Sequence, residues 1–253
     1  MKSIHVPKLG LRYWFALCLA SIFGANMGDF FAHVLGLGHI RGVPYLAAAL
    51  VAILLIERRE TLTHQAYYWT AIIIVRTAAT NLADLAASDM KQPRTWVMAA
   101  LSIMLVAAVG SRRSLAAPAQ SATKSDLPDT NWNYWLCMLI AGTLGTVLGD
   151  FTAGDAGLGL AKASTVLSCV LGLVFYLGRD RLQTVALYWP TIVLVRAAGT
   201  TVGDFFASRR GMGLGLALST AATGLIFIAA LVLWRERRGT SRTQSGHIRG
   251  DPD

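Results

Sequence analysis

Four aspartates recur in one repeated sequence frame, and their carboxyl groups are the groups in this chain best suited to do chemistry. Each aspartate lies fifteen residues after a tryptophan that directly follows a tyrosine. The four pairs are Trp14 with Asp29, Trp69 with Asp84, Trp135 with Asp150, and Trp189 with Asp204. Carboxyl groups forced close together cannot all stay ionised, so such a cluster binds protons or a cation. The frame therefore predicts an ion site if the four side chains converge.

Arginine and threonine side chains accompany the aspartates on one predicted helix face. Arg76 and Arg196 lie seven residues after their tryptophans, and Ser21 and Gly142 hold this position in the other two copies. At about 100° per residue in an α-helix, positions seven, eleven and fifteen after the tryptophan share one face. The predicted ion or solute site comprises Asp29, Asp84, Asp150, Asp204, Arg76, Arg196, Thr80, Thr146 and Thr200. Two arginines cannot pair with four aspartates, so two carboxylates lack a fixed partner; whether a metal ion or a proton occupies the site stays open.

The segments that carry these residues are long and apolar. The chain is 54% hydrophobic and only 15% charged, whereas soluble domains carry about 25% charged residues. Its apolar runs cover residues 13–31, 43–56, 67–87, 96–110, 132–151, 160–178, 187–207 and 213–234. A helix that spans a bilayer needs about 20 mainly apolar residues. We therefore predict an all-α membrane protein with about eight transmembrane helices, or six if the short second and fourth runs do not cross.

The repeated frame divides the chain into four parallel two-helix copies. The predicted parts are a cytoplasmic N-terminus (1–11), repeats at 12–60, 61–113, 132–181 and 182–238, a linker at 114–131 and a disordered cytoplasmic tail at 239–253. Most Lys and Arg residues lie in the segments predicted on the side of both termini, which the positive-inside rule places in the cytoplasm. Only copies two and four have an arginine seven residues after the tryptophan, so the four copies also group into two halves. Parallel repeats permit one ring around an axis, and they equally permit two separate pairs.

Small residues and aromatic pairs recur with the aspartates. Three copies hold Gly-x-x-x-Gly just before the aspartate, and copy two has Ala79 and Ala83 instead. The predicted helix-packing residues are Gly24, Gly28, Gly145, Gly149, Gly199 and Gly203. Small residues four apart let membrane helices approach closely. Trp14, Trp69, Trp135 and Trp189 are predicted to anchor the helices at the membrane interface, where aromatic residues are enriched.

Several classes of protein do not fit the sequence. The net charge of +9 comes mainly from basic residues between apolar runs, which is typical of a membrane protein and does not favour nucleic acid. The three cysteines lie inside apolar runs without metal-ligand spacing. Neither a phosphate-binding loop nor a Ser-His-Asp set is recognisable, so we predict no enzyme and no cofactor.

The chain resembles a family of bacterial membrane-anchored proteins built from tandem two-helix repeats of unknown function. The motifs that carry the resemblance are the Tyr-Trp pairs with Gly28-Asp29-Phe30, Gly149-Asp150-Phe151 and Gly203-Asp204-Phe205. Copy two departs from the pattern with Ala83-Asp84-Leu85. The resemblance implies a place in the bacterial inner membrane, and it implies no particular activity.

These observations lead to two functional hypotheses. The first is a transporter or channel for a small cation, with proton coupling as an option, in which the four aspartates form the site. Its partners are the lipid bilayer and a small cation or proton. The alternative is a membrane scaffold or partner-binding protein, in which the same aspartates and arginines only hold the helices together.

Overall fold

The protein is built from helices throughout the part of the chain that its computed structural model describes, namely residues 7, 9–59, 65–115, 132–179, 181–182 and 184–236. The eight α-helices are α1 (Leu11–Asp29), α2 (Gly38–Arg59), α3 (Gln65–Asp84), α4 (Arg94–Leu115), α5 (Trp132–Asp150), α6 (Gly159–Gly178), α7 (Val185–Ala207) and α8 (Leu216–Glu236). All eight are long and apolar enough to cross a membrane, which confirms the predicted class. Most of the predicted N-terminal segment, nearly all of the linker and the whole tail lie outside the described residues.

The second and fourth apolar runs form complete helices. Helix α2 begins at Gly38 and includes Pro44, and helix α4 begins at Arg94, so both start before the apolar run that predicted them. Each contains a segment of at least 18 residues that is apolar enough to span a bilayer. The six-span alternative is therefore not supported, because polar residues at the start of a helix had made these two segments look short.

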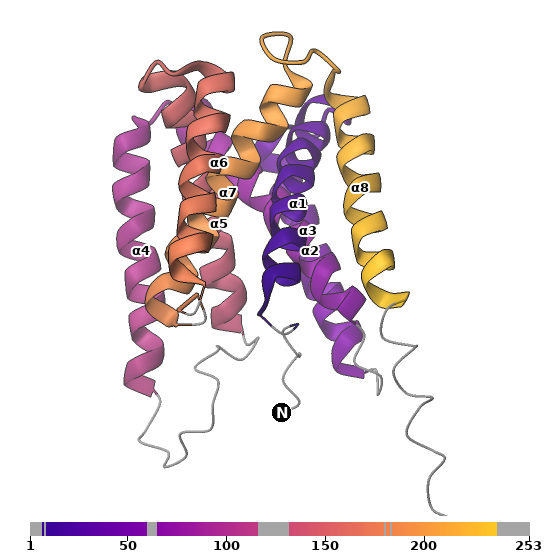
Figure 1. The fold of residues 1–253 in the computed structure, drawn as a ribbon, viewed down its shortest axis with the longest axis vertical. Coiled ribbons are helices and arrows are strands. Elements are labelled where there is room, and N and C mark those ends of the chain that lie inside the picture. The colour runs from indigo at the N-terminus through magenta and orange to yellow at the C-terminus, as the bar shows by residue number, and fades with distance from the viewer. Residues whose placement is uncertain are drawn as a thin grey trace, which may run out of the picture.

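Four helices form a closed inner ring. In this ring α1 packs on α3, α3 on α5, α5 on α7, and α7 on α1 (Figure 1). These are the first helices of the four copies, so every copy contributes one wall. Of the two arrangements that parallel repeats permit, the structure has the single ring. The boundary between the two predicted halves is not a gap, because both α3 with α5 and α7 with α1 pack across it.

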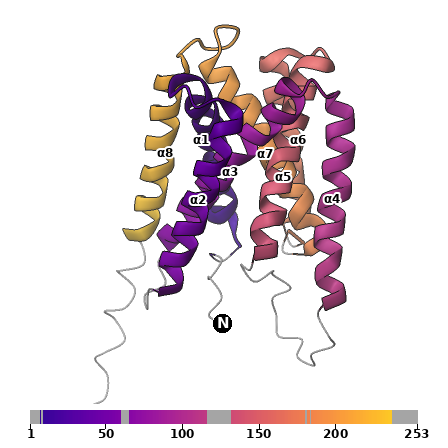
Figure 2. The same cartoon turned by 180° about the vertical axis from the view of Figure 1, so that it is seen from behind.

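The remaining four helices surround this ring, and each packs on the inner helix of the next copy. Helix α2 lies against α3, α4 against α5, α6 against α7, and α8 against α1 (Figure 2). A copy of the sequence repeat is therefore not a closed hairpin, since its two helices have their main contacts with different neighbours. Because each outer helix packs on the inner helix of the next copy, all four copies are linked. Helix α8 of the last copy packs on α1 of the first.

The aspartates lie where the helical winding changes. In copies one to three the α-helix ends at the aspartate and continues as five residues of π-helix, at Phe30–Val34, Leu85–Asp89 and Phe151–Asp155. In copy four, α7 runs on to Ala207. Each π turn ends its helix and does not interrupt it, because a bend or turn follows. The wider winding directly follows three of the four predicted site residues.

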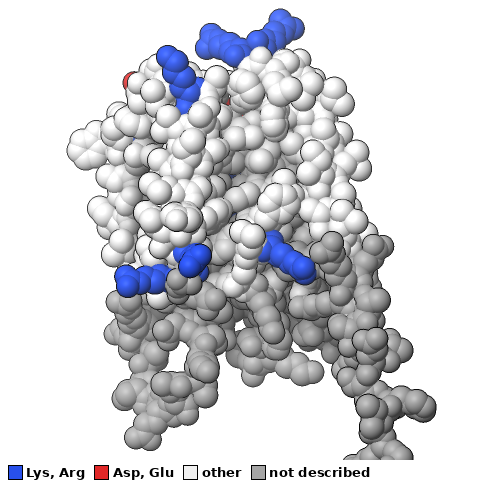
Figure 3. Space-filling view, viewed as in Figure 1, with Lys and Arg blue, Asp and Glu red and all other residues white. Residues whose placement is uncertain are grey.

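Charged side chains are confined to the two ends on the face shown in Figure 3. Between them lies a broad band with neither basic nor acidic side chains. Helix α1 begins and helix α8 ends at the same end of the bundle (Figure 1). Such a band, on helices of spanning length, is what a bilayer requires of the surface that faces lipid.

Small residues allow the inner helices to touch. A methyl group added at Gly24 would overlap the Cβ of Arg76, and one at Gly145 would lie 2.6 Å from the Cβ of Arg196. In the same register, a methyl group at Gly199 would lie 2.5 Å from the Cβ of Ser21. These contacts follow one rule. On each inner helix, the residue ten positions after the tryptophan contacts the next inner helix, at the residue seven positions after the tryptophan of that helix. Around the ring, a small residue always faces Arg, Ser or Gly.

Candidate functional site

A ring of four tyrosine hydroxyl groups closes one end of the inner helices, the end at which α1 begins. The ring consists of Tyr13, Tyr68, Tyr134 and Tyr188, each at most 1% exposed. Their oxygens are joined in a closed circle of four hydrogen bonds between 2.8 and 3.0 Å long. Each hydroxyl can donate one bond and accept another. This tyrosine ring therefore satisfies its own hydrogen bonds on the axis of the bundle.

The neighbouring tryptophans support the tyrosine ring from behind. Trp69 packs on Tyr13, with ring centroids 5.9 Å apart, and Trp14 packs on Tyr188 at 5.8 Å. Trp135 and Trp189 pack in the same way on Tyr68 and Tyr134. All four indoles are at most 5% exposed. The prediction that these tryptophans anchor the helices at the lipid interface is therefore wrong, because neighbouring inner and outer helices enclose them.

Arg196 connects all four inner helices at the centre of the bundle. From α7, its Nε donates to the Thr146 hydroxyl at 2.9 Å, and its Nη1 donates to the Ser21 carbonyl oxygen at 2.9 Å. Its Nη2 donates to the Arg76 carbonyl oxygen at 3.1 Å and to the Thr80 hydroxyl. The side chain is fully buried. Two of the three predicted threonines thus bind this guanidinium group, while the third, Thr200, has a buried hydroxyl with no partner among the described residues.

Arg76 lies between Arg196 and the tyrosine ring. Its side chain is also fully buried, and all four tyrosines lie within electrostatic range of it. Its Nη2 contacts the sulfur of Met138 at 3.8 Å. We predicted that both arginines would accompany the aspartates, but only Arg196 is directed toward them.

The four aspartates converge at the other end of the inner ring. Every pair among Asp29, Asp84, Asp150 and Asp204 is close enough to interact electrostatically. Arg196 interacts electrostatically with all four. Each aspartate is partly buried. The arrangement is thus a cluster of four carboxyl groups, here called the aspartate cluster, with one guanidinium group beneath it.

Few fixed cations neutralise the aspartate cluster. Asp84 lies 3.8 Å from Nε2 of His39, whose Nδ1 is 2.9 Å from the carboxylate of Asp89. Within the described residues, the other three aspartates of the cluster have no ion pair within 4.0 Å. Nor does any group of three His, Cys, Asp or Glu side chains there have a geometry that could hold a metal ion.

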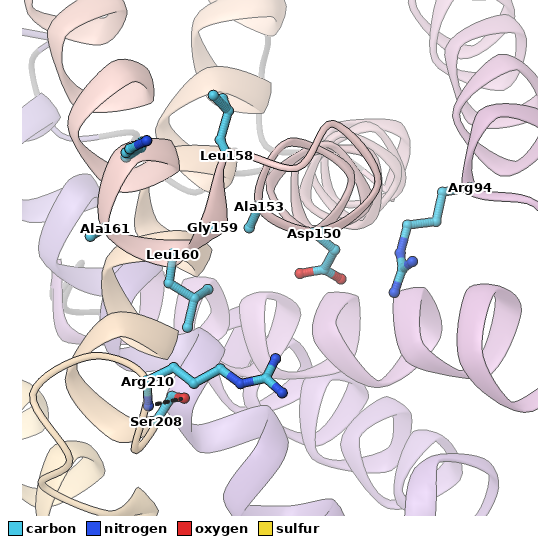
Figure 4. A pocket seen from close by; sticks show the side chains of 11 residues that line it. Arg94, Asp150, Ala153, Leu158, Gly159, Leu160, Ala161, Ser208 and Arg210 are labelled. Carbon is cyan, nitrogen blue, oxygen red and sulfur yellow. Dashed lines mark hydrogen bonds between the residues drawn. The ribbon is translucent and has the colours of Figure 1, made fainter.

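A pocket of about 610 Å³ lies beside Asp150, one member of the aspartate cluster, at the end away from the tyrosine ring. Asp150 lines it, together with the basic side chains of Arg94, Lys162 and Arg210. In Figure 4 the carboxyl group of Asp150 and the guanidinium group of Arg210 both point into this space. Arg94 also binds Asp155, with Nη1 2.9 Å from Oδ2. At least one member of the cluster is therefore reachable from this end.

Sequence reasoning missed the tyrosine ring, His39 and the pocket arginines. The tyrosines had a usable signal, because each directly precedes a tryptophan in every copy. His39, in the first turn of α2, and Arg210, in the connection between α7 and α8, have no equivalents in the repeat. Their positions carried no periodic signal that could have assigned them.

Comparison with known proteins identifies the sequence repeat. The family model described as Repeat of Unknown Function (DUF347) matches residues 12–61, 133–178 and 187–240. The chain belongs to this family. The second copy of the DUF347 repeat lies between the matched ranges, where Ala83 and Leu85 depart from the pattern of the other copies, yet the structure places α3 in the same ring. Neither the curated proteins nor the solved structures contain a match to the chain.

Proposed function

We propose that this DUF347 protein transports a small cation across the bacterial inner membrane, and that protonation of the aspartate cluster is coupled to transport. The observation that carries the proposal is the convergence of four carboxyl groups from four helices at one end of the ring. Ionisable groups inside a membrane are costly and are usually functional.

Charge in the aspartate cluster supports binding of a cation or proton. Four ionised carboxylates outnumber the nearby guanidinium groups of Arg196 and Arg94, and neighbouring carboxylates repel one another. Protons or a bound cation would relieve that repulsion. The pocket beside Asp150 opens one carboxyl group of the cluster to the exterior, and three basic side chains also line it.

The closed end of the bundle supports a transporter rather than an open channel. The tyrosine ring and the two buried arginines occupy the axis below the aspartate cluster. Transport along this axis requires the inner helices to separate at the tyrosine end, as alternating access demands. The positive-inside rule puts that end, with both chain termini, in the cytoplasm and the aspartate cluster toward the outside.

Replacement of all four aspartates by asparagine is expected to abolish transport and leave a folded protein. The measurement is ion or proton flux into liposomes containing purified protein, with Na⁺, K⁺ and divalent cations tested in turn. The control is Tyr176→Phe, which removes a hydroxyl group from a side chain on α6 that is 74% exposed and should keep wild-type flux. Undiminished flux in the four-aspartate variant would refute the site.

The alternative function is a membrane scaffold without transport. It is favoured by Arg196, which hydrogen-bonds three neighbouring helices and thus acts as a structural crosslink. A ligand that binds only the folded state raises the unfolding midpoint with concentration. A scaffold predicts that no cation raises this midpoint and that the four-aspartate variant is merely less stable.

A further inference from the structure

The Arg76 guanidinium group is a buried positive charge that has no counter-charge among the described residues. Its side chain is 0% exposed. Within the described part of the chain, its Nε and Nη1 have no hydrogen-bond partner. Its Nη2 meets only a thioether sulfur, at 3.8 Å, which is a weak acceptor. Buried polar groups are nearly always hydrogen-bonded, so each exception requires an explanation.

The groups around Arg76 do not supply the missing negative charge. On one side the tyrosine ring is satisfied by its own four hydrogen bonds. On the other side is Arg196, a second positive charge within electrostatic range. Of the two buried arginines, only Arg196 interacts electrostatically with the aspartate cluster. The two guanidinium groups therefore both lie within the inner ring, but only that of Arg196 is next to the carboxyl groups of the aspartate cluster.

The surroundings of Arg76 are small and able to donate hydrogen bonds. Gly142 lies beside it, and a methyl group added there would be 3.9 Å from Nη1 and 3.0 Å from the Cβ of Ala79, so only glycine leaves room at this position. The hydroxyl group of Ser21, which lies seven residues after its tryptophan as Arg76 does, is also buried and without a partner among the described residues. Hydroxyl and guanidinium N–H groups are donors that suit an anion.

Energetics favour an occupant with negative charge. An arginine side chain does not deprotonate in proteins, so it cannot avoid the free-energy cost of burying its charge by becoming neutral. An unpaired buried charge is strongly destabilising, and a like charge nearby makes it worse. A buried water would supply hydrogen bonds but no charge. We propose that a small inorganic anion, with the size and charge of chloride, binds against the Arg76 guanidinium group between the tyrosine ring and Arg196.

Halide-dependent stability tests the site. Purified protein would be prepared in sodium gluconate, whose anion is too large for the site, and titrated with NaCl or NaBr at constant ionic strength. Wild-type protein is expected to show a saturable rise in its thermal unfolding midpoint, of about 5 °C or more at concentrations well above Kd. Equal midpoints in gluconate, chloride and bromide would overturn the proposal and leave water as the occupant.

Variants locate the response. Arg76→Met keeps the length of the side chain and removes its charge, so it should lose the halide response, whereas Arg94→Met at the outer pocket should keep it. If Arg76→Met does not fold, Arg76→Lys should still respond, with a higher half-saturating halide concentration than wild type. A full response in Arg76→Met, or an unchanged half-saturation in Arg76→Lys, would place the anion elsewhere and refute the assignment.

The anion site and the proposed cation transport can fail separately. The variant with all four aspartates replaced by asparagine should keep the halide response, because the aspartate cluster lies beyond Arg196. Loss of flux with a retained halide response would support both proposals. A halide response that disappears in this variant would contradict the anion site as placed here.

Discussion

The Gly145→Ala variant is expected to unfold at a lower temperature than wild type, although alanine is the better helix former. The added methyl carbon would lie 2.5 Å from the carbonyl oxygen of Val193 and 2.6 Å from the Cβ of Arg196. One of these is backbone and the other is the root of a fully buried side chain, so neither can move aside alone. Overpacking of this kind costs about 1–3 kcal/mol. Helices α5 and α7 would have to separate, which also stretches the hydrogen bond from Arg196 to Thr146.

Gly172→Ala is the matched control for this prediction. Gly172 lies inside α6, and a methyl group added there would meet nothing within 4 Å. Alanine should therefore keep its ordinary advantage over glycine within a helix, about 0.5–1 kcal/mol, and raise the unfolding midpoint slightly. Opposite signs for the two variants, measured by thermal unfolding in detergent, would establish close packing at Gly145. If Gly145→Ala behaved like Gly172→Ala, the inner ring would be looser than the structure shows.

The arrangement of the inner helices could be predicted because the repeat keeps one helical register. Asp29, Asp84, Asp150 and Asp204 stand at the same distance from their tryptophans, so one rotation of each helix directs all four inward. Whether they meet on one axis could not be predicted. The closure of the ring depends on α7 packing on α1, a contact between the two ends of the chain.

The aromatic residues show where a sequence rule fails for a physical reason. The enrichment of tryptophan at membrane interfaces applies to helix faces that meet lipid. The inner helices have few such faces, since two ring neighbours and an outer helix enclose each of them. Trp96 and Tyr176, which lie on the outer helices α4 and α6, are 73% and 74% exposed. The Tyr-Trp pairs of the inner helices therefore face neighbouring helices and not lipid, and their tyrosines form the tyrosine ring.

The environments of Arg76 and Arg196 could not be distinguished in the sequence. Both lie seven residues after a tryptophan, and both are flanked by similar apolar residues. They differ because Arg196 meets Thr146 on the preceding inner helix, whereas the side chain of Arg76 turns toward Met138. Such a difference depends on side-chain direction, which spacing along the chain does not encode.

Removal of a single hydroxyl group from the tyrosine ring is expected to destabilise the protein more than removal of all four. In Tyr13→Phe, the hydroxyls of Tyr68 and Tyr188 each lose a partner, at 2.9 and 2.8 Å, in a site without water access. A buried hydroxyl left unsatisfied costs about 1–3 kcal/mol. With all four tyrosines replaced by phenylalanine, no buried hydroxyl remains unpaired, and the loss should be small.

The test is a comparison of unfolding midpoints for Tyr13→Phe, the four-tyrosine variant and Tyr176→Phe. The control removes a hydroxyl from a side chain that is 74% exposed, and it should unfold like wild type. If the four-tyrosine variant loses about four times as much stability as Tyr13→Phe, the hydroxyls act independently and the ring is not a cooperative unit.

If the effects of removing tyrosine hydroxyls on stability are not additive, this also indicates how the tyrosine end of the inner ring opens. Hydrogen bonds that form one circle are lost together, because breaking any one of them leaves two hydroxyls short of a partner. The tyrosine end would then behave as a two-state element, either closed with all four bonds or open with the hydroxyls exposed to water. An opening of that kind is what the proposed alternating access requires, and the four-tyrosine variant should therefore change the rate of cation flux while leaving the binding of ions at the aspartate cluster unaltered.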